Sequence, residues 1–450
     1  MKQPRSGLAI AAAMVVSAAV VTAEPKLPTD HIAAAVCPSD IRITGDWEIE
    51  VVVTHKGRGE VKRRFSVAPP HFVSVTDEPC GPLTEWITQP GWARMKIPGL
   101  MEGHHCARFV LDESSLVARS SPEADATVFE RGKDFRVDVE WCGIGRVAGG
   151  RIGDSQPVYL SYRFQKRRLD SVVLNSSGEL ELRRGEPHIS MPVPPPMAEC
   201  EVRVANIFIS ENLKQLGSAN VFPILETSFP EPPKPSPTEA ERLLPKTMAK
   251  LRSGEPLKIL AWGDSVTEGY LGEDQWQKQF VRQLKQWFPQ ANVELVTVGW
   301  GAHNSQDFMN APPGHIRNFA ETVLAAKPDL VVSEFVNDVP LEVAKVEQNY
   351  HQFLADFQAN GTEWIILTPH YSTFMNWPSE RDLDDDPRAY VKMLRQFAPE
   401  NKVALADAAA RYGRLWRQGI PYSTLMVNTV NHPDVRGMKI FADSLMALFP

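Results

Sequence analysis

Cysteine, clustered basic residues and long apolar segments are all scarce in this chain of 450 residues. Its five cysteines lie in the first half only, and their spacing matches no zinc-binding pattern. An oxidising compartment would allow at most two disulfides with one thiol left over, and the spacing leaves the pairing open. The cysteines are Cys37, Cys80, Cys106, Cys142 and Cys200.

Positive charge is not concentrated in any block. The 48 lysines and arginines, against 55 aspartates and glutamates, give a formal net charge of −7. We therefore expect neither a nucleic acid nor an anionic membrane surface as a partner. Beyond the N-terminus, no stretch reaches the roughly 18 apolar residues that a membrane span requires.

The N-terminus contains the one long apolar run. Lys2 and Arg5 precede apolar residues 8–21, and residues 21–23 are small enough for a cleavage site. We expect residues 1–23 to be a signal peptide, and the mature protein to be exported to the periplasm or secreted, free of the membrane. An uncleaved anchor is the alternative.

Residues 38–228 have the pattern of an all-β domain. Apolar and polar residues alternate in segments such as 47–53, 135–141 and 200–208, and glycines and prolines separate these segments. Such alternation is typical of antiparallel strands with one buried face, and we predict a β-sandwich. A role in binding carbohydrate or another surface has no motif to support it.

Residues 229–256 are predicted to connect two domains. The segment 231–237 contains four prolines and predicts a semi-rigid linker, which a helix over 238–252 follows. Strand and helix patterns then alternate over 257–450, which predicts an α/β domain with a doubly wound parallel sheet of about five strands. The predicted strands are 257–262, 293–298, 330–335, 364–367 and 403–406.

Polar motifs follow these predicted strands. Gly263-Asp264-Ser265 follows the first strand, the glycine-rich segment 299–305 follows the second, and Asn337-Asp338 follows the third. His432 lies just before the last predicted helix. The carboxyl ends of parallel strands lie at one edge of a sheet, so we expect these groups to converge. A serine, a base and N–H donors are what acyl transfer requires.

The four blocks GDSVTEG, VGWGAHNS, EFVNDV and NHPDVRG resemble, in this order, those of the SGNH (GDSL-type) hydrolases. The resemblance covers residues 257–450, and exported bacterial members with an N-terminal β domain are the nearest type. It implies that Ser265 is the nucleophile and that its N–H joins an oxyanion hole. The Asn337 side chain and the N–H of Ala302, or of Gly301 one residue earlier, would be the other donors. His432 would be the general base and then the general acid.

Three positions depart from the family pattern. Ala302 and Phe335 each stand where a glycine is usual, and we expect Phe335 to narrow the pocket. The aspartate three residues before the histidine falls at Thr429, which carries no carboxylate. Glu334, a charge in a predicted buried strand, is a candidate substitute acid, and an amide or carbonyl at Asn428 or Thr429 is another candidate for orienting His432.

Two further carboxylates are less suited to this role. Asp407 is expected to cap a helix, and Asp434 is too close to His432 along the chain. Other residues near the blocks are interpreted as polar wall or packing groups rather than catalytic ones, although the tryptophans could stack on a sugar, and the acidic run 382–386 as a solvated loop. These residues are His303, His315, His370, Trp262, Trp300 and Trp377.

The sequence thus predicts an exported serine ester hydrolase without metal or cofactor. Its substrate would be a small-molecule or polysaccharide ester, most simply an acetylated carbohydrate. A lipase- or thioesterase-type acyl hydrolase is one alternative, and a catalytically degenerate binding protein, suggested by Thr429, is another. An α/β-hydrolase ranks lower because Thr267 replaces the second glycine of Gly-x-Ser-x-Gly. The oligomeric state is left open.

Overall fold

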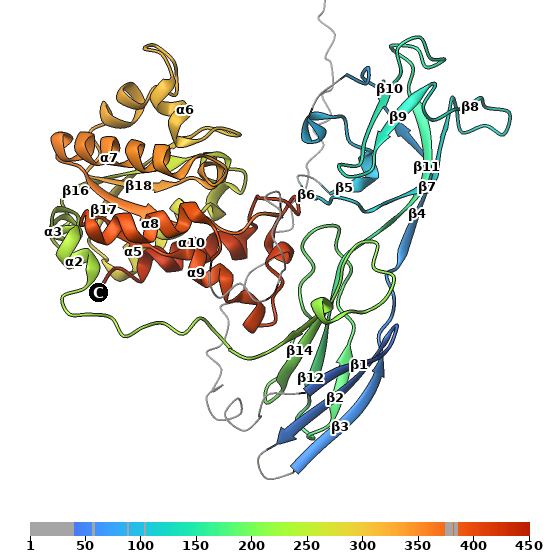
Figure 1. The fold of residues 1–450 in the computed structure, drawn as a ribbon, viewed down its shortest axis with the longest axis horizontal. Helices are drawn as coiled ribbons and strands as arrows, with labels where there is room; N and C mark the ends of the chain where they lie inside the picture. Colours follow the sequence, from blue (N-terminus) through green and yellow to red (C-terminus); the bar gives the residue numbers. More distant parts are fainter. Residues whose placement is uncertain (1–39, 56–58, 88–89, 103–104, 374–380, 382–385) are drawn as a thin grey trace, which may run out of the picture.

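The computed structural model describes residues 40–55, 59–87, 90–102, 105–373, 381 and 386–450. An elongated β region lies beside an α/β domain, and the C-terminus belongs to the latter (Figure 1). The expected signal peptide, Cys37 and Trp377 fall outside the described residues. None of the helices within the described ranges combines the length and apolar character needed to cross a bilayer.

The α/β domain contains a five-stranded parallel sheet, as the sequence predicted. The strand order is β17-β16-β18-β19-β20, so the sheet extends in one direction from β16 to β17 and in the other from β16 to β18. Ligands bind at such a topological switch point in open α/β sheets, at the carboxyl end of the strands. The strands are β16 (Pro256–Gly263), β17 (Asn292–Gly299), β18 (Leu330–Glu334), β19 (Glu363–Leu367) and β20 (Ala404–Ala406).

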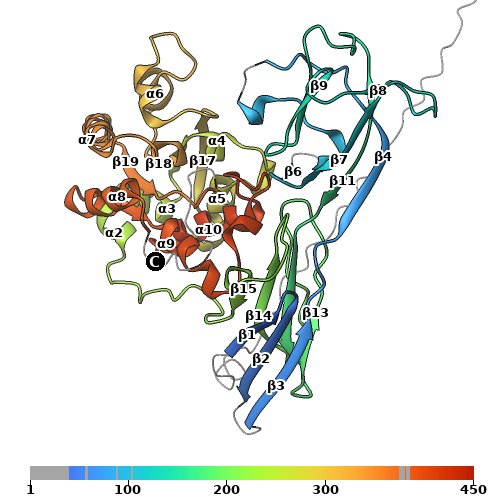
Figure 2. The same cartoon turned by 45° about the vertical axis from the view of Figure 1, so that its right-hand side comes forward.

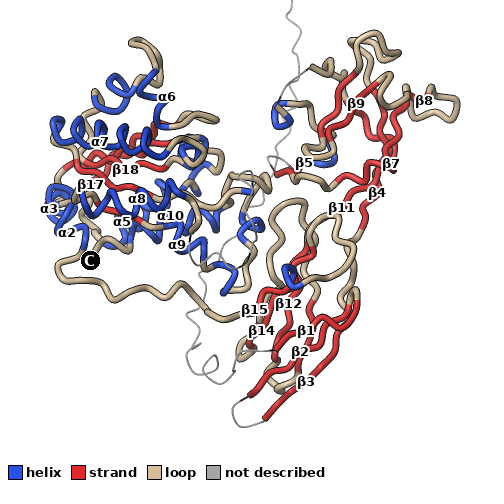
Figure 3. Tube along the Cα trace, in the orientation of Figure 1, coloured by secondary structure: helices blue, strands red, loops and turns tan. Residues whose placement is uncertain are grey.

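Helices cover both faces of this sheet (Figure 3). Alternate residues of β16 face opposite sides, with Ile259 and Ala261 in one core and Leu260 and Trp262 in the other. Helices α2, α3, α5, α9 and α10 pack on the first core, and α6, α7 and α8 pack on the second. The helices are α2 (Glu239–Leu243), α3 (Pro245–Ser253), α4 (Ser265–Glu268), α5 (Trp276–Trp287), α6 (Ser305–Asn310), α7 (Val343–Asn360), α8 (Ala389–Glu400), α9 (Ala408–Gly413) and α10 (Val435–Met446).

The single helix expected over 238–252 is wrong, because two helices occupy this segment. Thr238 caps α2 through a reciprocal pair of hydrogen bonds with Glu241, and Pro245 stands in the first turn of α3. A proline has no N–H to continue a preceding helix, but it fits the start of a new one. After the break, Met248 and Leu251 of α3 pack in the first core.

The β region is antiparallel, as predicted, but it has two cores rather than one (Figures 1 and 2). In the first β lobe, β1-β2-β3 packs face to face on β13-β12-β14-β15, which is a small sandwich. Its strands are β1 (Asp40–Gly45), β2 (Glu48–His55), β3 (Gly59–Ser66), β12 (Arg168–Leu174), β13 (Leu180–Arg183), β14 (Val202–Ile209) and β15 (Val221–Pro223).

The second β lobe is built on the sheet β4-β11-β7-β8, with two short hairpins beside it. The four described cysteines, of which three belong to this lobe, form no disulfide. Burial raises the pKa of Cys80 to about 12 and that of Cys142 to about 11, so both are thiols at neutral pH. The strands are β4 (Phe72–Cys80), β5 (Met101–Glu102), β6 (His105–Cys106), β7 (Leu111–Arg119), β8 (Val128–Phe129), β9 (Phe135–Asp138), β10 (Gly143–Arg146) and β11 (Val158–Gln165).

An extended connection runs from β15 to α2 along the α/β domain (Figure 1). It includes the predicted proline linker, and ion pairs hold it in place. Glu226 pairs with Arg414, and Glu231 pairs with Arg411 on α9. The linker therefore contacts the α/β domain along its length.

Candidate active site

Ser265 stands at the sharp turn between β16 and α4. Asp264 caps α4, because its side chain accepts the N–H of Val266 at 3.0 Å, and Ser265 is the first residue of the helix. The turn passes so close to β18 that a Cβ at Gly263 would lie 2.2 Å from the Glu334 carbonyl oxygen. Only glycine fits this approach, and the turn leaves Ser265 half-buried at the carboxyl edge of the sheet.

His432 lies directly against Ser265. Its Nε2 is 2.9 Å from the Ser265 Oγ, although the two residues are 167 positions apart. The imidazole stacks on the ring of Tyr270, with centroids 4.7 Å apart, and the Tyr270 hydroxyl donates to the Pro433 carbonyl at 2.8 Å. A serine hydroxyl hydrogen-bonded to a fixed imidazole is the arrangement that activates a serine nucleophile.

Burial lowers the pKa of His432 to about 4. The imidazole is therefore neutral at pH 7, with a lone pair available for the serine proton. Among the described residues, Ser265 is the one hydrogen-bond partner of the ring. No described carboxylate is bonded to Nδ1, so no such bond stabilises the imidazolium that forms during catalysis.

None of the three candidates for orienting His432, which are Glu334, Asn428 and Thr429, is hydrogen-bonded to its imidazole ring. Glu334 is fully buried at the end of β18, and its Oε2 accepts the Thr267 hydroxyl at 3.5 Å. Burial and the nearby carboxyls of Asp264 and Asp338 raise the pKa of Glu334 well above its usual range, which favours its protonated form. Glu334 is bonded to Thr267 and not to His432, so it does not take the place of the family's aspartate.

Thr429 points away from the imidazole, since its Oγ1 accepts the N–H of Arg108 at 3.1 Å. The Asn428 side chain acts on the backbone instead, where its Oδ1 accepts the N–H groups of Val430, Asn431 and His432. The two remaining carboxylates both cap helices: Asp407 caps α9, as expected, and Asp434 caps α10.

Asn337 is placed by the nucleophile turn itself. It follows β18, its N–H donates to Asp264 Oδ2 at 2.9 Å, and its Nδ2 donates to the His303 carbonyl at 3.0 Å. One N–H of the side-chain amide remains for a ligand. Asp264 thus connects the turn of Ser265 to Asn337. Asp264 belongs to the Gly263-Asp264-Ser265 motif, but the sequence alone did not reveal this role.

In the described part of the glycine-rich turn, the N–H of Ala302 rather than that of Gly301 is left to donate. The Gly301 N–H is engaged, because it donates to Glu268 Oε2 at 2.9 Å. Ala302 has a φ of +62°, a conformation that glycine favours, and within the described ranges neither its N–H nor that of Ser265 has an acceptor. Ser265, Ala302 and Asn337 therefore retain the N–H groups that an oxyanion hole needs.

Most of the aromatic residues near the blocks pack in the core. Trp262 is fully buried among five phenylalanines, and Phe335 is one of them, so the expectation that Phe335 narrows the pocket is wrong. Trp300 is half-buried and stacks on His303 with centroids 3.8 Å apart. The phenylalanines are Phe308, Phe319, Phe335, Phe353 and Phe357.

His370 is buried and supports the loop that carries His432. Its Nε2 donates to the Asn431 carbonyl at 2.8 Å, and burial together with Arg388 lowers its pKa to about 3. Asp386, the one described member of the acidic run, is buried and paired with Arg388 at 2.6 Å, so it is not part of a solvated loop. Within the described chain, no group of three or more His, Cys, Asp or Glu is arranged to hold a metal ion.

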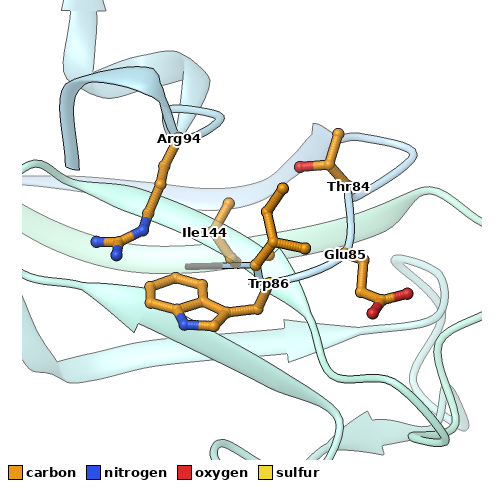
Figure 4. A pocket seen from close by; sticks show the side chains of 7 residues that line it. Thr84, Glu85, Trp86, Arg94 and Ile144 are labelled. Atoms are coloured by element: carbon orange, nitrogen blue, oxygen red, sulfur yellow. The ribbon is translucent and has the colours of Figure 1, made fainter. Parts of the chain in front are cut away.

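A small cavity in the second β lobe lies apart from this site. It has a volume of about 10 Å³, and its lining includes Thr84, Trp86 and Ile144 (Figure 4). Such a volume accommodates about one water molecule and no sugar ring. The polar groups suited to chemistry are those around Ser265.

Some solved structures share limited similarity with this chain. No curated protein matches the sequence. Among solved structures, a two-domain esterase active on acetylated mannans shares 20% identity at a TM-score of 0.36, over 46% of this chain and 51% of that chain. An acetyl xylan esterase shares 20% identity at 0.34, over 42% and 98% of the two chains. A member of the lipolytic G-D-S-L family from Veillonella parvula shares 19% at 0.33, over 43% and 98%.

The chain covers about half the length of the two-domain esterase. The family model of the GDSL-like lipase/acylhydrolases matches residues 261–440, which include Ser265, the glycine-rich turn, Asn337 and His432. This part of the C-terminal α/β domain is therefore similar to the GDSL-like lipase/acylhydrolase family.

Proposed function

We propose that this protein is an exported serine esterase that removes a small acyl group, most simply acetyl, from a carbohydrate. The observation that carries the proposal is the 2.9 Å hydrogen bond between His432 Nε2 and Ser265 Oγ. It lies beside the three N–H donors of Ser265, Ala302 and Asn337. A nucleophile, a neutral base and an oxyanion hole are together sufficient for ester hydrolysis.

The reaction proceeds in two acyl transfers. Ser265 Oγ attacks the ester carbonyl carbon while His432 Nε2 takes its proton, and the N–H groups stabilise the negative oxygen of the tetrahedral intermediate. When the intermediate collapses, His432 gives the proton to the leaving alcohol and an acyl-serine remains. Water then attacks this ester, with His432 again acting as base, and the carboxylic acid leaves.

Packing behind the nucleophile supports a small acyl group. The aromatic cluster around Trp262 and Phe335 fills the space between the sheet and helices α6 and α7, and both of these side chains are fully buried. A long acyl chain would need to displace these rings from a close-packed core. This favours an acetyl ester over the substrates of a lipase or thioesterase.

The surface beside the oxyanion turn supports a carbohydrate alcohol. Trp300 and His303 form a half-buried stack, and the His303 carbonyl holds the catalytic amide of Asn337. Aromatic faces next to polar groups suit the apolar faces and hydroxyls of a sugar ring. Export, proposed from residues 1–23, would bring the enzyme to polysaccharides outside the cytoplasm.

Ester turnover as a function of acyl length tests this proposal. Purified protein is assayed with p-nitrophenyl acetate, butyrate and octanoate, and acetate release is measured from acetylated xylan and acetylated glucomannan. We expect the highest kcat/KM on acetate, acetate release from at least one polysaccharide, and no activity in Ser265→Ala. A preference for octanoate would indicate a lipase or thioesterase, and wild-type activity equal to that of Ser265→Ala would indicate a binding protein.

A further inference from the structure

The loop that carries His432 is bonded to the second β lobe. Cys106, in β6, donates its N–H to the Val427 carbonyl at 3.1 Å. Arg108 donates its N–H to Thr429 Oγ1 at 3.1 Å. Figures 1 and 2 show β6 beside the loop that leads into α10. Two backbone groups of the β region thus contact the chain just before the catalytic histidine.

Residues 427–432 form one hydrogen-bonded unit, which we call the histidine loop. The Val427 N–H donates to the His432 carbonyl at 2.8 Å, and Asn428 Oδ1 accepts the His432 N–H at 3.1 Å. A displacement of Val427 or Thr429 is therefore transmitted directly to His432. The two bonds from the β lobe hold Val427 and Thr429 within this unit.

Thr429 has a backbone conformation that needs external support. Its φ is +55°, which a β-branched residue rarely adopts. The Arg108 N–H binds its hydroxyl, the Thr373 hydroxyl donates to its carbonyl at 2.7 Å, and its own N–H reaches the Met426 carbonyl at 3.2 Å. Strained conformations persist where the surroundings determine them, and they are concentrated at functional sites.

We propose that the β lobe completes the active site by holding the histidine loop, and that Thr429 is the positioning residue through which it does so. Thr429 stands where the family has its aspartate, but it acts through the loop backbone rather than on the imidazole. Contact with Arg108 then orients His432 in place of the missing acid. This inference rests on the proposed Ser265–His432 chemistry.

The bonds from Cys106 and Arg108 to the histidine loop, which we call the clamp, can be tested separately from other contacts between the β region and the α/β domain. Asn206 of the first β lobe donates its Nδ2 to the Gly419 carbonyl at 2.7 Å, which is also a bond between the β region and the α/β domain. Gly419 lies outside the histidine loop. Asn206→Ala therefore weakens the interface without acting on His432, and it serves as the matched control.

The test compares Thr429→Val, which keeps the shape but removes the acceptor, with Thr429→Ser, which keeps it. Thr429→Gly removes the acceptor while relieving the positive φ, and it secures a folded variant if Thr429→Val fails to fold. Each variant, with Asn206→Ala, is measured for kcat, KM, thermal unfolding and the pH dependence of kcat/KM on p-nitrophenyl acetate.

We expect Thr429→Val and Thr429→Gly to lose about tenfold to a hundredfold in kcat with little change in KM, because misplacement of a catalytic group by about 1 Å has an effect of this size. Thr429→Ser should recover most of the loss. The acid limb should move to higher pH in the two impaired variants as water reaches His432. Asn206→Ala should lower the unfolding temperature but retain kcat.

Two results separate the failure of the clamp from that of the proposed chemistry. If the wild type is active, Ser265→Ala is inactive, and the Thr429 variants keep wild-type kcat and pH profile, the clamp is refuted alone. Equal kcat losses in Thr429→Ser and Thr429→Val also refute it, since the hydroxyl would then be irrelevant. A wild type without Ser265-dependent turnover refutes both proposals.

Discussion

The pH dependence of activity is expected to be unusual for an enzyme with a histidine base. Burial lowers the pKa of His432 to about 4, and no described carboxylate is bonded to Nδ1 to raise it. At pH 5, a base with a pKa of 4 is about nine-tenths neutral, whereas an unperturbed histidine with a pKa of about 6.5 is only about 3% neutral. The two cases differ about thirtyfold in active enzyme at pH 5.

The assay is kcat/KM for acetate release, followed between pH 3 and pH 8 by direct quantification of acetate. We expect a plateau above about pH 5 and a fall with a midpoint near pH 4, which reports the free enzyme. His370, across the loop, has a pKa of about 3 and stays neutral over the plateau. A midpoint near pH 6.5 would refute the reasoning, because it would require either a hydrated His432 or a carboxylate partner.

Three substitutions probe other parts of the site. Asn337→Ala should lower kcat by about 10²–10³-fold, as loss of one oxyanion donor does, while Ser265 still reacts with a fluorophosphonate; unchanged kcat would exclude Asn337 from the oxyanion hole. Glu334→Gln should keep its ester turnover at pH 7, and lost turnover would restore the surrogate-acid hypothesis. The pKa of Glu334 is raised in the folded state. Its contribution to stability is therefore complete below about pH 4.5 and is lost as the pH rises through the folded pKa. The glutamine variant should accordingly unfold at a higher temperature than the wild type at pH 9. Ala302→Gly, which relieves a φ of +62°, should raise the free energy of unfolding by on the order of 1 kcal/mol in urea titrations, and a decrease would show that Ala302 is unstrained.

The sequence was sufficient to predict the α/β sheet and the residues that meet at its edge. Near-continuous apolar runs marked β16, β18 and β19 within a few residues of their true ends, since buried parallel strands have this composition. The topological rule for parallel sheets then brought Ser265 and His432 to one edge. The bond from the Gly301 N–H to the Glu268 carboxylate favours Ala302 as the donor, and only coordinates reveal such a bond.

The sequence mispredicted or missed the roles of residues whose function depends on the groups around them in the fold. Phe335 was expected in the pocket, but its side chain belongs to the aromatic core around Trp262. Glu334 was considered as a substitute acid because it is a charged residue in a buried strand, whereas burial raises its pKa and its Oε2 is bonded to Thr267. The contact of Arg108 with Thr429 could not be predicted from the sequence, because it is made by a backbone N–H, which every residue but proline has.

Covalent labelling is the most direct test of whether Ser265 is the nucleophile. The native protein is treated with a fluorophosphonate at pH 7, and the adduct is located by peptide mass spectrometry. We expect one adduct per chain, on Ser265, and none in Ser265→Ala. An unlabelled wild type, or an adduct that persists in Ser265→Ala, would contradict it.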